Sequence, residues 1–226
     1  MERGPKYPYW HSTLMEATGA WAERRRLAKA MREVIDRLVT SDAPESELRM
    51  AAGALERYAA RLAAHPRRVL PAGFAETANA GDVGALFDYS PLIGLSNPMA
   101  PPIVLHVEGD IVRGTATFGA AYEGPPGHLH GGIVAASFDE VLGFAQSTTG
   151  HPGMTGRLTV RYRQPTPLYV ELQFEARVLR VEGRKIFTEG HVRAGEVVTA
   201  EAEGLFISVD LVKMHELIEA RQRRDT

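Results

Sequence analysis

The chain has 226 residues, of which 44% are hydrophobic and 24% charged, with a formal net charge of -2. This composition is that of a globular protein able to bury a core, and the small net charge gives no general attraction for nucleic acid or anionic membranes. The absence of cysteine excludes disulfides, thiolate nucleophiles and cysteine-based zinc sites. Because the sequence has no signal-peptide core and no apolar run approaching ~20 residues, we expect a cytoplasmic protein without membrane insertion.

Residues 1–68 are predicted to form an aromatic-rich arm followed by a helical hairpin. The second helix is expected to begin at Asp42 as its N-cap, with Pro44 in the first turn and Glu45 three residues after the cap. Two short amphipathic helices cannot form a core alone, so we expect the hairpin to dock on the main domain or on a second copy. Apolar residues recur at helical spacing at Leu27, Met31, Val34, Ile35 and Leu38, and again at Leu48, Ala52, Leu55, Ala59 and Leu62.

The rest of the chain is predicted to contain a connector, one α+β domain and a tail. Residues 69–102 are rich in Pro and Gly and form the connector, residues 103–210 form the domain, and residues 211–226 are a polar tail. An antiparallel sheet wrapped around one helix explains the order of the predicted elements. Strand patterns at 103–107 and 111–118 precede an apolar helix at about 131–147, and further strand patterns follow at 158–163, 169–181, 186–193 and 197–209.

The predicted central helix is apolar on nearly all sides, yet Asp139 and Glu140 lie in its middle. A helix with this pattern is buried, and an unpaired carboxylate in a dry interior is costly or is driven to its neutral form. At least one of the two acids is therefore expected to face a cleft, water or a partner. The alternative is that both lie on a narrow polar stripe or in a subunit interface.

The same helix opens with His130-Gly131-Gly132. Small residues let a ligand approach the backbone closely, and the free N–H groups of a first helical turn stabilise negative charge. A thioester carbonyl placed there would have its developing oxyanion stabilised. The tripeptide alone is a weak signal, but Asp139 nine residues after His130, inside an apolar helix framed by strands, makes it much stronger.

These motifs resemble the hotdog-fold acyl-CoA thioesterases of the PaaI / thioesterase-superfamily type. In that family His-Gly-Gly opens the central helix and a catalytic Asp or Glu lies nine residues after the histidine, matching His130 and Asp139. The family's Thr or Ser at the start of the next strand is matched by Thr155, and its Tyr-x-x-Pro by residues 162–165. The resemblance covers roughly residues 100–210, and the stretches 122–127 and 181–185 also resemble a mammalian member.

The sequence departs from the family pattern at Gly124. Some members have an Asn or Gln at this position, six residues before the histidine, that helps to polarise the thioester. The carbonyl must then be held by backbone N–H groups, with help from His130 or other residues. The mammalian member resembles this chain here, so the departure does not argue against activity.

The resemblance implies a hotdog domain that hydrolyses an acyl-CoA to a free acid and CoA. Asp139 would act as general base on water or as nucleophile, with Glu140 as the fallback acid. Gly131 would supply the oxyanion N–H. His130 would either approach the thioester or only cap the helix, and Thr155 would bond the attacking water or Asp139, unless it is an ordinary strand residue.

Further residues are predicted to contact the substrate: Gly132, Glu140, Arg157, Arg184 and Lys185. The basic residues among them are candidates for the CoA phosphates. For any single one a solvated strand face is the simpler explanation, and Arg184 and Lys185 are preferred because they lie in a turn that matches the family. Four histidines, at positions 106, 128, 130 and 151, lack the spacing of a metal site, so we expect neither metal nor cofactor, CoA being part of the substrate.

The resemblance also implies partners and leaves one rival function. The family pairs two domains edge to edge with active sites at the interface, which implies a homodimer and allows a dimer of dimers. No nucleic-acid partner is expected. The rival is a non-catalytic acyl-CoA or fatty-acyl binding module on the same fold, since fold does not fix function. A hydratase acting on enoyl-CoA would need a differently placed Asp and His pair, which the sequence lacks.

Overall fold

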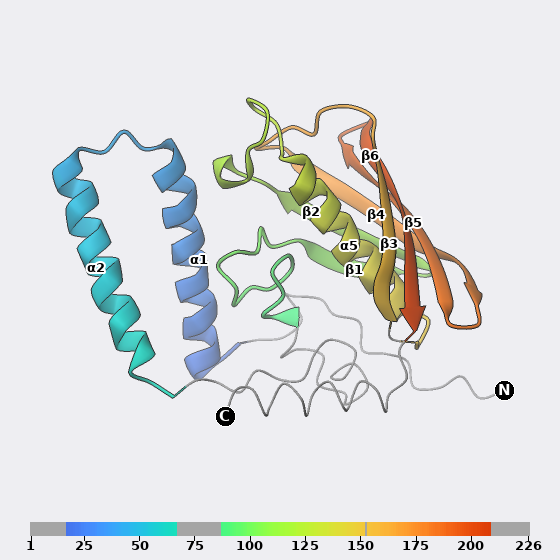
Figure 1. The fold of residues 1–226 in the computed structure, drawn as a ribbon, viewed down its shortest axis with the longest axis horizontal. Helices are drawn as coiled ribbons and strands as arrows, with labels where there is room; N and C mark the ends of the chain where they lie inside the picture. Colours follow the sequence, from blue (N-terminus) through green and yellow to red (C-terminus); the bar gives the residue numbers. More distant parts are fainter. Residues whose placement is uncertain (1–16, 67–86, 152, 209–226) are drawn as a thin grey trace.

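The computed structural model of the chain describes residues 17–66, 87–151 and 153–208. Two long helices come first, α1 (Gly19–Thr40) and α2 (Glu45–Ala63), and they run in opposite directions (Figure 1). Both predicted helices are confirmed, but the predicted cap is wrong. Pro44 is the N-cap of α2, with an extended backbone (φ -66°, ψ 153°) and no side-chain cap. Asp42 therefore lies outside the helix, and two acids in the first turn, Glu45 and Glu47, favour the positive end of the helix dipole instead.

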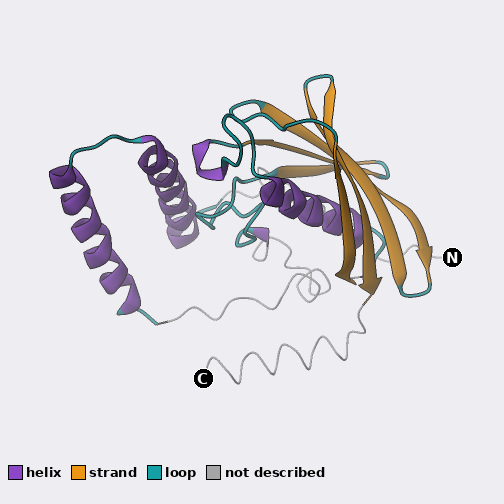
Figure 2. Cartoon of the chain, turned by 45° about the horizontal axis from the view of Figure 1, so that its top comes forward, coloured by secondary structure: helices purple, strands orange, loops and turns teal. Residues whose placement is uncertain are grey.

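The main domain is an antiparallel sheet of six strands in the order β1-β2-β4-β5-β6-β3. Helix α5 (Gly131–Ser147) follows β2 along the chain, and β3 then runs along the far edge of the sheet beside β6 (Figures 1 and 2). This arrangement confirms the predicted α+β hotdog fold. The strands are β1 (Val104–Glu108), β2 (Ile111–Thr117), β3 (Gly153–Tyr162), β4 (Glu171–Glu182), β5 (Lys185–Ala194) and β6 (Val197–Ser208).

The core lies between α5 and the inner face of the sheet. Phe138 and Leu142 of α5 are almost fully buried and pack against residues of the strands such as Phe174, whose ring meets that of Phe138 edge to face at 6.2 Å. Gly204 lets the helix approach β6 closely, because a Cβ there would lie 2.6 Å from Thr188 Oγ1 and 3.3 Å from a methyl carbon of Leu142. Burial of each such apolar side chain contributes about 1.5–3 kcal/mol, which fixes α5 firmly in the sheet.

The connector and α1 lie beside this core, and α2 lies on the far side of α1 (Figure 1). Phe87 and Ile93 of the connector are buried in the core. Helix α1 contacts the connector and the short 3-10 helix η1 (Ala120–Tyr122), and Ala28 is its buried residue. No residue of α2 is buried in the described part of the chain. Neither these two helices nor α5 combines the length and apolarity that a membrane span requires.

Candidate active site

Asp139 and Glu140 point in different directions from the middle of α5. Asp139 is exposed, and its Oδ1 accepts a hydrogen bond of 2.8 Å from Thr155 Oγ1. The expectation that one acid faces water is therefore confirmed, and Thr155 is one of the residues that the fold brings to it. The Thr155 hydroxyl holds the Asp139 carboxylate in a fixed direction on the exposed side of α5, so the carboxylate is available as a base or a nucleophile.

A β-bulge in β3 explains why Thr155 points at α5. Leu158 pairs with Gly204 on the inner face of the sheet, and Thr155 pairs with Phe206 on the same face, although Leu158 comes three positions after Thr155 on β3. Strict alternation would place them on opposite faces. The register shift between Thr155 and Arg157 supplies the extra residue and re-aims the threonine. This irregularity is also why the predicted strand began at residue 158, whereas β3 begins at Gly153.

Gln146 is a residue of the site region that the sequence prediction missed. It is almost fully buried near the end of α5, and its side chain bonds the turn that leads into β3. Its amide nitrogen donates to His151 O, and its Oε1 accepts from Gly153 N–H at 3.2 Å. These bonds fix the start of β3 two residues before Thr155. An amide side chain near the end of a mostly apolar helix was the available signal.

The first turn of α5 presents one free backbone donor. His130 is the N-cap, and its Nδ1 accepts the N–H of Gly132 at 3.0 Å, which shows the capping role that was one of its two predicted alternatives. Within the described residues nothing accepts the N–H of Gly131. Tyr162 Oη donates to Gly131 O at 2.8 Å and thereby ties this turn to β3. Gly131 is thus the available oxyanion donor, whereas Gly132, predicted beside it, already has a partner.

Gly124 lies directly against the backbone of His130. A Cβ on Gly124 would be 2.7 Å from His130 Cα, and the N–H of Gly124 donates to His128 O at 2.9 Å. A longer side chain could be accommodated only if the loop moved. The missing Asn or Gln is therefore a property of the loop's path here, and polarisation of a bound carbonyl falls to the backbone.

Glu140 faces the connector rather than the exposed side of α5. Ser90 Oγ donates to its Oε2 at 3.1 Å, and the same hydroxyl oxygen accepts the N–H groups of Leu92 and Ile93. Burial raises the pKa of Glu140 to about 7, an effect that the Ser90 hydrogen bond opposes and the charge of Asp139 reinforces. Glu140 therefore holds the connector against the central helix, away from Asp139's exposed side.

The three predicted phosphate-binding residues lie apart from Asp139. Arg157 pairs with Leu205 on the outer face of the sheet, so its side chain leaves on the side opposite α5. Arg184 lies in the β4–β5 turn and Lys185 is the first residue of β5, both at the same end of the sheet as Thr155. They are two strands away from it, which is about 10 Å at ordinary strand spacing. Arg184 Nε also donates to Ser208 O at 3.0 Å. Arg184 is therefore within reach of a long, extended substrate. Lys185 precedes the fully buried Ile186 on β5, so its side chain, like that of Arg157, points to the outer face, which is the wrong face for a substrate bound along α5.

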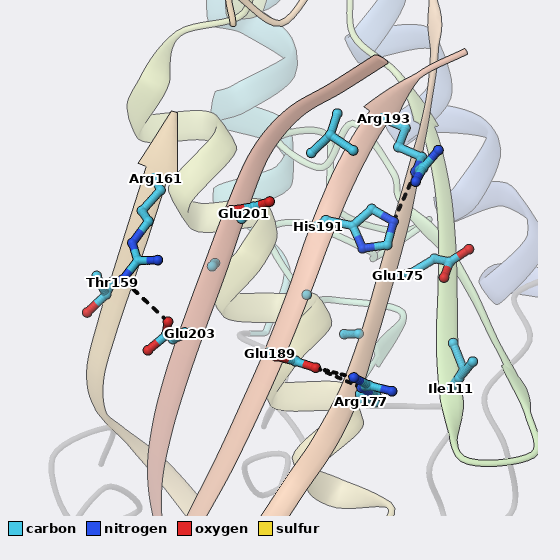
Figure 3. A pocket seen from close by; sticks show the side chains of 14 residues that line it. Ile111, Thr159, Arg161, Glu175, Arg177, Glu189, His191, Arg193, Glu201 and Glu203 are labelled. Carbon is cyan, nitrogen blue, oxygen red and sulfur yellow. Dashed lines mark hydrogen bonds and ion pairs between the residues drawn. The ribbon is translucent and has the colours of Figure 1, made fainter. Parts of the chain in front are cut away.

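A cavity of about 580 Å³ lies on the outer face of the sheet, with α5 behind the strands (Figure 3). Its charges largely neutralise one another: Arg177 pairs with Glu189 at 2.6 Å and Arg161 with Glu203 at 3.7 Å. Burial lowers the pKa of His191 in its wall. In the described ranges, no three His, Asp or Glu side chains gather where a metal could bind. The cavity therefore offers no free carboxylate base comparable with Asp139.

Gly131 and Asp139 of one chain lie far apart for a single reaction. Eight residues separate them on α5, which corresponds to about 12 Å along the helix axis and about 80° around it. An oxyanion donor must be about 3 Å from the carbonyl oxygen, and a carboxylate that attacks directly must be about as close to the carbonyl carbon. One chain therefore does not bring the Gly131 donor and a directly attacking Asp139 carboxylate to the same thioester carbonyl.

Comparison with known proteins identifies the family of this fold. Residues 126–201 match the model of the family described as Thioesterase superfamily. Acyl-coenzyme A thioesterase THEM4 from Xenopus laevis is 37% identical over 93 residues, 40% of this chain and 42% of that protein. The Bos taurus protein of the same name is 38% identical over 94 residues, 41% of this chain and 38% of its own length. The chain thus spans about two fifths of these curated relatives.

A solved structure extends the similarity beyond the sheet. The crystal structure of protein RHA08564, a thioesterase superfamily protein, is 37% identical in sequence, with a TM-score of 0.73. The match covers 81% of this chain and 94% of that chain. With this extent of similarity, and with the hotdog fold in place, the chain belongs to the thioesterase superfamily.

Proposed function

We propose that this protein hydrolyses an acyl-CoA thioester to a free acid and CoA, with Asp139 as the catalytic carboxylate. The observation that carries the proposal is an exposed carboxylate on an otherwise buried apolar helix, fixed by a hydrogen bond of 2.8 Å from Thr155. The name acyl-coenzyme A thioesterase, which the curated relatives carry, supports the substrate class.

The chemistry follows from the two groups that the site offers. As general base, Asp139 takes a proton from water while the water oxygen bonds to the thioester carbon. As nucleophile, the carboxylate itself forms that bond and water later cleaves the resulting anhydride. In both routes the carbonyl electron pair moves onto oxygen, where the Gly131 N–H stabilises it. Collapse of this oxyanion expels CoA as its thiolate, which then takes up a proton.

We propose further that each site uses two copies of the chain. The distance along α5 supports this, because Gly131 and Asp139 of one chain do not reach the same carbonyl. β3 is an edge strand whose far side has no partner among the described strands, and most of its residues are exposed. An unpaired edge is a template for pairing. Two copies paired through β3 about a twofold axis would set α5 of one copy antiparallel to α5 of the other. The first turn of each α5 would then face the part of the other α5 that carries Asp139.

The proposed activity is tested by thiol release from a panel of CoA thioesters, from acetyl to palmitoyl and including aryl and hydroxyacyl forms. Wild type is compared with Asp139→Asn and with Asp110→Asn, which changes an exposed acid in the β1–β2 turn. We expect Asp139→Asn to lose about 10²-fold or more in kcat and Asp110→Asn to match wild type. If wild type binds acyl-CoA and releases no thiol, the binding-module function replaces the catalytic one.

The oxyanion donor can be removed without changing a side chain that binds anything. Gly131→Pro deletes the N–H at the first helical position, where proline is favoured, and the preceding His130 already has the extended backbone (ψ 131°) that proline requires. We expect about a 10²–10³-fold loss in kcat. Gly131→Ala keeps the N–H, and its Cβ would be 3.5 Å from Tyr162 Oη, an ordinary contact. The alanine variant is expected to lose far less than the proline variant.

Mixing the two inactive variants tests the two-copy site. Dimers re-formed from Asp139→Asn and Gly131→Pro chains would carry one site with both defects and one intact site. We expect roughly a quarter of wild-type activity, because half the dimers are mixed and each has one intact site of two. If one chain supplied both groups, every site would keep one defect and no activity would return.

A further inference from the structure

The direction of the proposed oxyanion donor depends on a main-chain hydrogen bond just before it. His130 N–H donates to Tyr122 O at 2.9 Å, and this bond joins the two ends of the loop between these residues. The loop is also tied at Leu129, whose N–H donates to Thr166 O at 2.8 Å. Gly131 follows directly, so the position of the Tyr122 carbonyl is one of the restraints on the orientation of the Gly131 N–H, beside the hydrogen bond from Tyr162 to Gly131 O.

Tyr122 is held on its other side by the connector and the core. Its hydroxyl donates to Met99 O at 2.9 Å, and its ring meets Phe118 edge to face with centroids 5.5 Å apart. The side chain is half-buried, and burial raises the pKa of its hydroxyl. A tyrosine fixed by its ring and its hydroxyl has little freedom to move its own carbonyl.

Helix α1 reaches Tyr122 by two routes. Arg32 Nη1 donates to Asn97 O at 2.9 Å, two residues before the Met99 carbonyl that accepts the tyrosine hydroxyl. Asp36 lies against Gly119, the N-cap of η1, so closely that a Cβ on that glycine would overlap its carboxylate. η1 lies between α1 and the start of α5 (Figures 1 and 2).

The remaining contacts fix α1 to the connector. Trp21 Nε1 donates to Asp88 Oδ2 at 2.6 Å, and Arg25 forms a salt bridge of 2.7 Å with the same carboxylate, which is fully buried. Removing one partner of a buried pair leaves an uncompensated charge, so this anchor is strong. Positions 21, 25, 28, 32 and 36 recur at helical spacing, so one mostly polar stripe of α1 makes all of these contacts.

We infer that α1 is a positioning element of the active site, which holds Tyr122 through Arg32 and Asp36 and thereby aims the Gly131 N–H. The inference rests on the proposed function, since it assigns α1 a part in that reaction. The family model matches residues 126–201 and leaves α1 outside. α1 is then a support that lies outside the matched domain, and Arg32, Asp36 and Tyr122 are its positioning residues.

A double-mutant cycle on kcat separates positioning from general stability. Arg32→Ala is compared with Arg37→Ala, an exposed arginine on the same helix, in wild-type and Gly131→Pro backgrounds. Because a misplacement of 1 Å can cost up to 10²-fold, we expect Arg32→Ala to lower kcat about tenfold and to change KM less than about twofold. Without the donor there is nothing left to aim, so in Gly131→Pro the same change is expected to cost less than about twofold. Tyr122→Phe, which removes only the bond to Met99, is expected to follow the same pattern with a smaller loss.

Hydrogen exchange gives a second readout that does not depend on turnover. The amide of His130, which donates to Tyr122, is expected to exchange faster in Arg32→Ala and at the wild-type rate in Arg37→Ala. Unchanged exchange, an unchanged kcat, or an equal loss of kcat in both backgrounds would each overturn the inference. A wild type that releases no thiol refutes the proposed function instead, and the exchange rates still decide whether α1 holds the loop.

Discussion

The central helix and the N-terminal helices are held by different forces. α5 buries eight of its residues, most of them apolar, between the strands. α1 buries Ala28 and is held through charged and polar side chains, whereas its apolar residues Val34 and Leu38 are exposed. Helix α2 has no buried residue in the described part of the chain. Apolar periodicity thus identified all three helices, but it identified the contacting side only for the helix that lies inside the core.

Truncation of a core side chain of α5 is expected to have the largest effect on stability. Leu142 is fully buried and packs against the glycines of β5 and β6. Leu142→Ala removes its burial and leaves a cavity, and we expect the free energy of unfolding to fall by about 2–5 kcal/mol. Urea denaturation measures it. A loss below about 1 kcal/mol would contradict the view that α5 is fixed by apolar packing.

The fold was predictable where one physical signal dominates. Alternation with period two marks β4 and β5, since each has one buried face, and the bounds of α5 follow from an apolar run that begins at Gly131. The start of β3 was missed because its bulge breaks the alternation. The docking face of α1 was missed because Arg25 and Arg32 have the pattern of solvated residues until a partner such as Asp88 is known. The predicted arm and tail fall largely in residues 1–16 and 209–226, which lie outside the described residues.

Glu140→Gln is expected to change how stability depends on pH. The folded pKa of Glu140 is about 7 against 4.5 for the free side chain, so between these values the folded state binds more protons than the unfolded state. In wild type, the contribution of the Glu140 carboxyl to the free energy of unfolding is therefore fully present below about pH 4.5, and it is lost as the pH rises through about 7. The glutamine variant lacks this pH dependence and keeps an acceptor for the Ser90 hydroxyl. Its free energy of unfolding should therefore exceed that of wild type by a margin that grows to at most about 3 kcal/mol above pH 7.

Urea denaturation at a series of pH values from about 4 to 8 checks this expectation. Glu47→Gln, which changes an exposed glutamate of α2, is the matched control and should run parallel to wild type. If the stability of Glu140→Gln also ran parallel to wild type across this pH range, the Glu140 carboxylate would be hydrated in the folded state. The connector would then not exclude water from α5 at Ser90.

The candidate site was predictable as residue types at a spacing, but not as an arrangement in space. The nine-residue interval from His130 to Asp139 and the position of Thr155 led to groups that the fold places at one helix and one strand. The sequence could not show that Asp139 is exposed while its neighbour Glu140 is half-buried against the connector. Adjacent helix residues differ in direction by about 100°, and the connector has no periodic pattern. Whether Gly131 and Asp139 serve one site or two is a question of distance, which spacing alone does not answer.

Truncation on the apolar side of α2 is expected to have the smallest effect. Leu55 is about half exposed in the single chain, so Leu55→Ala should change the free energy of unfolding by no more than about 0.5 kcal/mol. The comparison with Leu142→Ala is then a contrast between a helix inside a core and one outside it. A loss above about 1 kcal/mol would mean that another segment or another copy covers Leu55. Its dependence on protein concentration would distinguish the two, because only a contact between copies strengthens as concentration rises.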